Sequence, residues 1–161
     1  MRTEAYLSND RLFRYWLLRV WNPALPLYAL IGSNPSTADE MVDDHTIRKE
    51  IGFGRRLGYG GLLKLNVGAF RATNPRDWAA ASDPFGPDNS IDSLQGYLIK
   101  FAPHLIVAAW GKPCLSCDRG RKRADLVKKN ILSMKCWGEN ADGSPRHPLM
   151  LPYTTELEDF N

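Results

Sequence analysis

The chain has 161 residues, of which 43% are hydrophobic and 24% are charged, and its formal net charge is +3. This length and composition exclude a disordered or fibrous chain and predict one globular domain over residues 1–161. The mildly basic charge permits a polyanionic partner such as DNA without requiring one.

The first half of the chain predicts a strand–helix–strand unit. A strand over Arg11–Trp21 is expected to pair, across a turn, with the buried strand Leu27–Ile31. An amphipathic helix over Thr46–Leu57 and a strand over Leu62–Val67 follow. Two strands joined by a helix at this spacing pair in parallel.

The second half alternates helices and strands in the same way. A short helix is expected over Pro75–Ala81, and a longer helix, which runs to Phe101, precedes a strand over His104–Trp110. A helix over Arg121–Met134 and a last strand over Lys135–Trp137 follow. This alternation predicts an α/β fold, a three-layer α/β/α sandwich with a mostly parallel central sheet.

Three predicted strands end in unusual polar residues, namely Asn34-Pro35-Ser36, Asn66 and Trp110-Gly111-Lys112. Ligands of open α/β sheets bind beyond the carboxyl ends of the strands, so these residues should converge on one site. The loop from Gly32 to His45 is the first candidate. The Asn34 amide can orient a water molecule or hydrogen-bond to a ligand, although Asn34-Pro35 also fits the start of a turn.

An acidic segment follows in the same loop, with carboxylates at Asp39, Glu40, Asp43 and Asp44 and an imidazole at His45. These groups could bind a divalent cation or supply a general base. The alternative is a solvated acidic loop in which Asp44 caps the next helix.

Two further features carry charge or a titratable group. His147, in a loop stiffened by Pro148, could donate to an anionic leaving group or be a plain surface residue. A basic cluster could contact nucleic-acid phosphates or form an ordinary charged helix face; its members are Arg119, Arg121, Lys122, Arg123, Lys128 and Lys129. Three aromatic residues could stack on bases or serve in packing; they are Phe70, Trp78 and Trp110.

The three cysteines make an odd number, which argues against a disulfide framework. The N-terminal segment lacks the apolar region of a signal peptide, and no apolar run is long enough to span a bilayer. We therefore expect a cytoplasmic protein without cofactor or metal. A zinc site built from Cys114, Cys117, Cys136 and His147 is the alternative.

Nearly the whole chain resembles the family called domain of unknown function 1643. The residues that carry the resemblance are Arg14-Tyr15, Gly32 to Asp39, Asp43 to Arg48, Gly58-Tyr59-Gly60, Asn66, Phe70 to Thr73, Gly86 to Asn89, Ala109 to Gly111 and Asp142 to Leu149. The family has no established function, and the C-x-x-C at Cys114 is not one of its features.

Three shorter motifs resemble the uracil-DNA glycosylase superfamily, especially its mismatch-specific branch. They are Gly32-Ser33-Asn34-Pro35, the strand end Val107 to Lys112, and His147-Pro148-Leu149. The resemblance implies that Asn34 positions the hydrolytic water and that His147 stabilises the departing base. In place of the usual serine after histidine-proline, this chain has Leu149.

The motifs and the two resemblances predict a set of site residues and leave three functional hypotheses. The catalytic residues would be Asn34 and His147. The nucleic-acid backbone would be contacted by Arg121, Lys122, Arg123, Lys128 and Lys129. The substrate would be bound by Gly32, Ser33, Pro35, Ser36, Asp44, His45, Asn66, Phe70, Trp110 and Lys112. The first hypothesis is a DNA N-glycosylase-like hydrolase that acts on a flipped base of DNA or on a nucleotide. The second is a non-catalytic binding module for such a base, nucleotide or nucleic-acid end. The third is a metal-dependent hydrolase or transferase that uses Asp39–His45.

Overall fold

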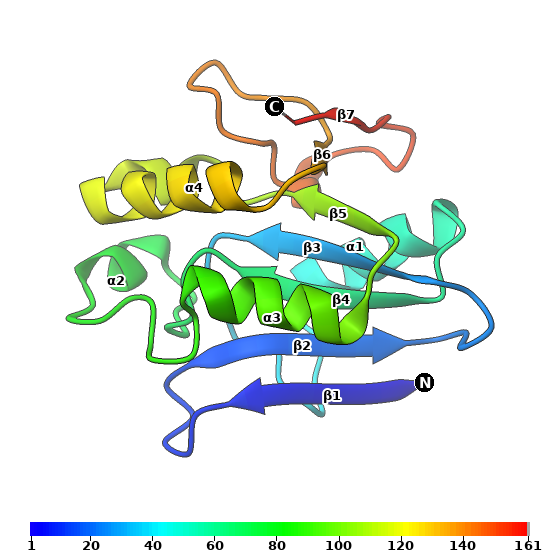
Figure 1. Cartoon of the computed structure of the whole chain (residues 1–161), viewed down its shortest axis with the longest axis horizontal. Coiled ribbons are helices and arrows are strands. Elements are labelled where there is room, and N and C mark those ends of the chain that lie inside the picture. The colour runs from blue at the N-terminus through cyan, green and yellow to red at the C-terminus, as the bar shows by residue number, and fades with distance from the viewer. Residues whose placement is uncertain (161) are drawn as a thin grey trace.

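The computed structural model describes residues 1–160 and, among them, every side chain except that of residue 115. Its centre is one seven-stranded sheet with the strand order β1-β2-β4-β3-β5-β6-β7 (Figure 1). The strands are β1 Arg2–Leu7, β2 Arg14–Val20, β3 Leu27–Gly32, β4 Gly61–Asn66, β5 Leu105–Ala108, β6 Lys135–Cys136 and β7 Glu158–Asp159. The helices are α1 His45–Arg56, α2 Pro75–Ala80, α3 Ile91–Phe101 and α4 Asp118–Asn130, with short 3-10 helices η1 Lys112–Ser116 and η2 Pro148–Met150.

The sheet is mixed rather than mostly parallel. Strands β4, β3, β5 and β6 run parallel to one another. Strands β1, β2 and β7 pair antiparallel with their neighbours, so the sheet has three parallel and three antiparallel pairings. The expectation of a mostly parallel sheet is wrong because the two edges, including the unpredicted strand β1, are antiparallel.

The expected pairing of β2 with β3 is also wrong, because β4 lies between them and pairs with both. The connection is made at Gly60, whose carbonyl accepts from the N–H groups of Trp21 and Asn22 at 2.9 Å each and whose N–H donates to Pro26 at 2.8 Å. A Cβ at Gly60 would collide with the Asn22 carbonyl. The glycine therefore lets the start of β4 enter between β2 and β3.

Helices cover both faces of the sheet (Figure 1). Helix α1 buries Ile47 and Phe53 against a face that includes Leu30 and Leu62. Helices α3 and α4 contribute Leu94, Ala124 and Val127 to the core on the other face. Each fully buried aliphatic side chain of this kind stabilises the fold by about 1.5–3 kcal/mol relative to exposure. The predicted β–α–β unit is present, since α1 connects the parallel neighbours β3 and β4.

Helix starts follow their capping residues. Asp44 Oδ1 accepts from the Ile47 N–H at 2.9 Å at the start of α1, and the Ser90 hydroxyl accepts from the Ser93 N–H at 3.0 Å at the start of α3. Such caps satisfy N–H groups that have no partner inside the helix.

In the part of the chain that the structure describes, no helix has the length and apolar character required to cross a membrane.

Candidate functional site

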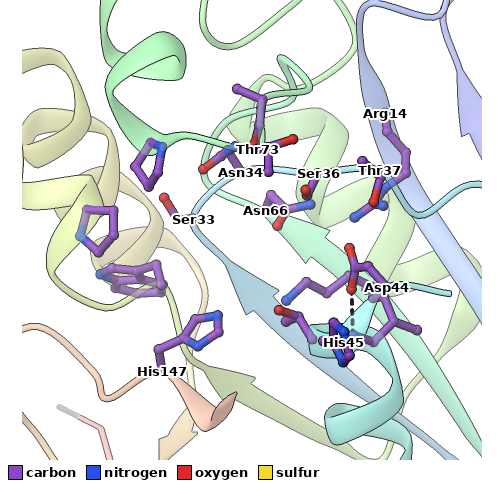
Figure 2. Close-up of a pocket in the computed structure, with 17 residues that line it drawn as sticks. Arg14, Ser33, Asn34, Ser36, Thr37, Asp44, His45, Asn66, Thr73 and His147 are labelled. Carbon is purple, nitrogen blue, oxygen red and sulfur yellow. Dashed lines mark hydrogen bonds between the residues drawn. The ribbon is translucent and has the colours of Figure 1, made fainter. Parts of the chain in front are cut away.

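A cavity of about 380 Å³ opens beyond the carboxyl ends of β3, β4 and β5 (Figure 2). Eight of the residues expected at the site line it, namely Ser33, Asn34, Ser36, Asp44, His45, Asn66, Trp110 and His147. The strand ends therefore converge as the sheet arrangement requires. Four other expected residues, Gly32, Pro35, Phe70 and Lys112, are not among the lining residues.

Gly32 acts by leaving space at the base of the cavity. It pairs in register with Asn66 on the neighbouring strand. A Cβ on Gly32 would lie 2.5 Å from Lys64 Nζ and 2.9 Å from Asn66 Oδ1. A larger residue would therefore displace both of these cavity side chains.

The loop after β3 is held rigidly by the loop after β4. The N–H of Gly68 donates to the Ser33 carbonyl, and that of Ala72 donates to the Pro35 carbonyl, at 2.9 Å each. Asn34 adds a side-chain bond, from Nδ2 to the Ala72 carbonyl at 2.9 Å. Nδ2 also donates to the Pro35 carbonyl at 3.1 Å. The amide hydrogens of Asn34 are thus used internally, which leaves its side-chain oxygen as the acceptor available to a ligand or water.

Asn66 ends β4 with its carboxamide in the cavity wall. Its side chain is only 1% exposed, and within the described chain neither Nδ2 nor Oδ1 has a hydrogen-bond partner. A buried polar group without a partner costs about 1–3 kcal/mol. This donor and acceptor pair is therefore suited to a ligand that presents a matching acceptor and donor.

His147 faces the cavity from the side opposite Arg14 (Figure 2). Its Nδ1 accepts from the Leu149 N–H at 3.2 Å, so in the neutral ring Nε2 carries the proton. Burial, with a further contribution from the Lys64 charge, lowers the pKa of His147 to about 4. At neutral pH this side chain is therefore a neutral Nε2–H donor.

Gly111 allows the His147 loop to approach the end of β5. It has a φ of +63°, a conformation that favours glycine. Its N–H donates to the Pro145 carbonyl at 2.9 Å, and a Cβ there would lie 3.3 Å from the His147 Cβ. Gly111 in the Trp-Gly-Lys segment thus allows the loop that carries His147 to pack against the end of β5.

Two charged residues that were not among the expected site residues, Arg14 and Lys64, also line the cavity. Lys64 Nζ pairs with Glu50 Oε1 at 2.6 Å, and both side chains are almost completely buried. Burial raises the pKa of Glu50 and lowers that of Lys64. Arg14 is 2% exposed and donates from Nη1 to the Ala38 carbonyl at 2.7 Å. The available signal was a basic residue inside an apolar strand sequence, at Arg14 in FRYWLL and at Lys64 in LLKLNV.

The acidic segment does not assemble into a metal site. Asp39 pairs with Arg11 at 3.2 Å, Asp43 pairs with Arg19 at 2.7 Å, and Asp44 caps α1. These carboxylates are separately engaged, and the described residues contain no group of three or more His, Cys, Asp or Glu side chains placed to hold a metal. This arrangement gives no support to the metal-dependent hypothesis.

The cysteines are not gathered into a zinc site either. All are free thiols. Cys114 donates to the Ser33 hydroxyl at 3.4 Å, and burial raises its pKa to about 12. Cys117 caps α4 by accepting from the Gly120 N–H at 3.4 Å. The alternative of a structural zinc at Cys114, Cys117 and Cys136 is therefore not supported by the geometry.

Several residues of the basic cluster serve contacts within the chain. Arg123 donates to the Asn89 carbonyl and lies over the Phe85 ring, while Lys128 lies 4.2 Å from the centroid of Phe160. Arg121 is paired with Asp118. Arg119, which belongs to the cluster but not to the expected site set, donates to the carbonyls of Ala79 and Ala81 at 2.8 Å each. Lys122 and Lys129 are exposed on α4.

The three aromatic candidates also differ in position. Trp78 is fully buried and donates to the Pro84 carbonyl at 2.9 Å. Phe70 packs edge-on against Phe13, with ring centroids 5.9 Å apart. Trp110 alone of the three lines the cavity, although it is 2% exposed and packs against Phe160. Packing accounts for Phe70 and Trp78.

Comparison with known proteins gives one match. The sequence model of the family described as "Protein of unknown function (DUF1643)" matches residues 14–149. No curated protein and no solved structure matches the chain significantly. The matched segment contains every cavity residue named above.

Proposed function

The chain belongs to the DUF1643 family, and we propose that it binds a nucleobase in the carboxyl-edge cavity and hydrolyses its N-glycosidic bond. The observation that carries the proposal is the buried, unpartnered carboxamide of Asn66. A primary amide offers one acceptor and two donor hydrogens. Nucleobases present donors and acceptors side by side on their edges, and enzymes that act on bases read that edge by hydrogen bonds.

Asn34 would orient the attacking water. Its Nδ2 group is anchored to the Ala72 carbonyl at 2.9 Å, which holds the side-chain oxygen in a fixed direction. That oxygen would accept a hydrogen bond from a water molecule placed against the sugar carbon. Fixed positioning of a reactant contributes to rate because the entropy of orientation is lost before the reaction begins.

His147 would stabilise the departing base. As the bond between C1′ and the base nitrogen breaks, its electron pair moves to the base, which becomes an anion. The neutral Nε2–H of His147 is a preorganised donor for that developing charge. The water oxygen forms the new bond to C1′ and releases a proton, and the base gains a proton on leaving.

A relationship to the uracil-DNA glycosylase superfamily, with its three-layer sandwich, is part of this proposal. It is supported by the meeting of three short motifs at one cavity, through Asn34, Trp110 and His147. If the substrate is a polymer, the target nucleotide must leave the base stack, which costs a few kcal/mol. Placement in a reducing cytoplasm is consistent with free thiols but stays a prediction.

The test is release of a free base, measured by liquid chromatography. The substrates are single- and double-stranded oligonucleotides with uracil, 5-hydroxymethyluracil, hypoxanthine or a G·T mismatch, together with the corresponding mononucleotides. The proposal predicts release that falls at least about 100-fold in Asn34→Ala, the size of effect found when a transition-state contact is removed. Arg56→Gln, at an exposed position in the last turn of α1, is the control and should retain full activity.

A binding module is the second candidate, favoured by one observation. Asn34 is an amide, so it can orient a water molecule but cannot take its proton as a carboxylate would. Under this alternative no substrate releases a base, while binding still depends on Asn66. Absence of both release and binding for the whole panel would reject both candidates.

A further inference from the structure

Arg14 is a buried, charged cavity residue to which the proposed base hydrolysis assigns no role. It reaches the cavity from β2, on the far side from the loop of His147 (Figure 2). Burial lowers its pKa to about 10, so the guanidinium remains charged at neutral pH. Nη1 donates to the Ala38 carbonyl, whereas Nε has no partner among the described residues. A buried cation with an unpartnered donor is costly unless an anion satisfies it.

No carboxylate of the described chain forms an ion pair with Arg14. The buried carboxylate of Glu50 is paired with Lys64 at 2.6 Å. Asp44 attracts Arg14 through space, but its Oδ1 is used to cap α1. The same cap occupies the N-terminus of α1, so the helix end is not the anion site. The other buried cation that lines the cavity, Lys64, already has the Glu50 carboxylate as its partner. An anion on this side of the cavity would therefore pair with Arg14.

Ser36 and Thr37 carry hydroxyl groups and line the cavity on the same side as Arg14 (Figure 2). Their backbone carbonyls are taken up by Arg71, which donates to Ser36 at 3.2 Å and to Thr37 at 3.0 Å. Arg71 thus satisfies these two carbonyl oxygens. A guanidinium beside two hydroxyl groups is a suitable donor set for a phosphate group.

The side chains across the cavity suggest where each chemical group of a ligand would lie. His147 lies at one side, Asn66 in the middle, and Arg14 with Ser36 and Thr37 at the other (Figure 2). The volume of about 380 Å³ is within the range of about 300–1,000 Å³ that is typical of small-molecule sites. It has room for more than a base alone.

We infer that the ligand is a nucleoside 5′-monophosphate whose phosphate monoester is bound by Arg14, Ser36 and Thr37. This inference rests on the proposed function for the base-binding side of the cavity. A free nucleotide is favoured over a nucleic-acid strand because few residues of the basic cluster are available to bind the phosphates of a strand. Arg123 and Lys128 make contacts within the chain. The 5′-phosphorylated end of a strand would offer the same phosphate chemistry.

The experiment is isothermal titration of the full chain with matched ligands. Each of the deoxynucleoside 5′-monophosphates of adenine, guanine, cytosine, thymine and uracil is compared with its nucleoside and with a 5′-phosphorylated oligonucleotide. A further ligand, 2-deoxyribose 5-phosphate, tests the phosphate side without a base. We expect the monophosphate to bind at least 10-fold more tightly than the nucleoside, and the oligonucleotide to bind more weakly than the monophosphate.

Arg14→Gln should remove the preference for the phosphorylated ligand, a loss of about 10- to 100-fold for a charge-assisted contact. Arg56→Gln is the matched control and should keep the preference. Since Arg14 is buried, Arg14→Gln must first show an unchanged circular dichroism spectrum. If it does not fold, Ser36→Ala with Thr37→Val replaces it and should reduce the preference.

The outcomes separate this inference from the proposed function. Equal binding of nucleoside and monophosphate by the wild type overturns the inference while leaving base recognition in place. Tighter binding of the oligonucleotide than of the monophosphate also overturns it, in favour of a strand end. Binding of 2-deoxyribose 5-phosphate that depends on Arg14, together with no base release from any substrate, supports the phosphate site and rejects hydrolysis.

Discussion

Two lysine–carboxylate pairs of the same length lie in different regions of the molecule. Lys64, which lines the cavity, and Glu50 are 2.6 Å apart, and their side chains are 5% and 0% exposed. At the sheet edge, Lys135 and Asp159 are also 2.6 Å apart but 42% and 71% exposed. The edge pair is solvated and contributes little to stability, whereas burial shields the cavity pair from solvent. Taking charges out of water is costly, so a buried ion pair is weak evidence for stability, and ionisable groups with perturbed pKa values in a cleft mark a candidate functional site.

The largest effect should come from breaking the buried pair. Lys64→Met leaves Glu50 buried without its partner and should lower the free energy of unfolding by about 3–5 kcal/mol. Lys135→Met at the edge should lower it by less than about 1 kcal/mol. Urea denaturation of both variants measures the difference. Similar small losses in the two variants would mean that water reaches the cavity pair as freely as the edge pair.

The double variant Lys64→Met with Glu50→Leu sharpens the same comparison. Removing both charges of a buried pair is often neutral or stabilising. The double variant should therefore recover much of the stability lost in Lys64→Met. It should nevertheless bind nucleotide more weakly than the wild type, because Lys64 lines the cavity.

The pH dependence of stability should report the state of His147. Its pKa is about 4 in the folded chain, below the ordinary value of 6.5, chiefly because of burial. Between pH 4 and pH 6.5 the unfolded chain binds more protons at His147 than the folded chain does. The contribution of His147 to the free energy of unfolding is therefore highest above pH 6.5 and falls as the pH is lowered toward 4. In thermal denaturation, His147→Gln should flatten the fall in Tm over this interval. An unchanged slope would contradict the neutral donor assigned to His147.

The smallest effect is expected on the outer surface of α4. Lys122 and Lys129 are exposed, and substitution of both by Gln should change binding of a nucleoside 5′-monophosphate by less than about twofold. Titration at 50 mM and 200 mM salt provides the check, because phosphate contacts on a polymer produce a strong salt dependence. A tenfold loss in the double variant would move the phosphate site from the cavity to α4.

The sequence predicted which strand ends meet at one cavity, but it did not identify the buried charged residues there. Asn34, Asn66 and Trp110 were placed together because polar residues at parallel strand ends must meet at one edge. The β2–β3 pairing failed because the insertion of β4 depends on the close backbone contact at Gly60, which periodicity does not encode.

The buried cations were missed for a different reason. A lysine or arginine inside an apolar strand is ordinarily expected to face solvent, yet Arg14 and Lys64 are 2% and 4% exposed. Their burial depends on long-range neighbours, Ala38 for Arg14 and Glu50 for Lys64. Of the two alternatives for the acidic segment, the structure shows the one in which Asp44 caps the next helix. The partners Arg11 and Arg19 could not be predicted because they lie on another part of the chain.

We propose that the Asn66 carboxamide, which has no hydrogen-bond partner among the described residues, binds a nucleobase. The most direct measurement is the chemical shift of the Asn66 side-chain amide in a ¹⁵N-labelled sample, assigned by its disappearance in Asn66→Leu. Titration with the deoxynucleoside 5′-monophosphates should shift this resonance for the base that is recognised, and the same nucleotide should lose at least 10-fold in affinity for Asn66→Leu. An Asn66 resonance that stays unmoved while a nucleotide binds would contradict the claim, because the base would then be read elsewhere.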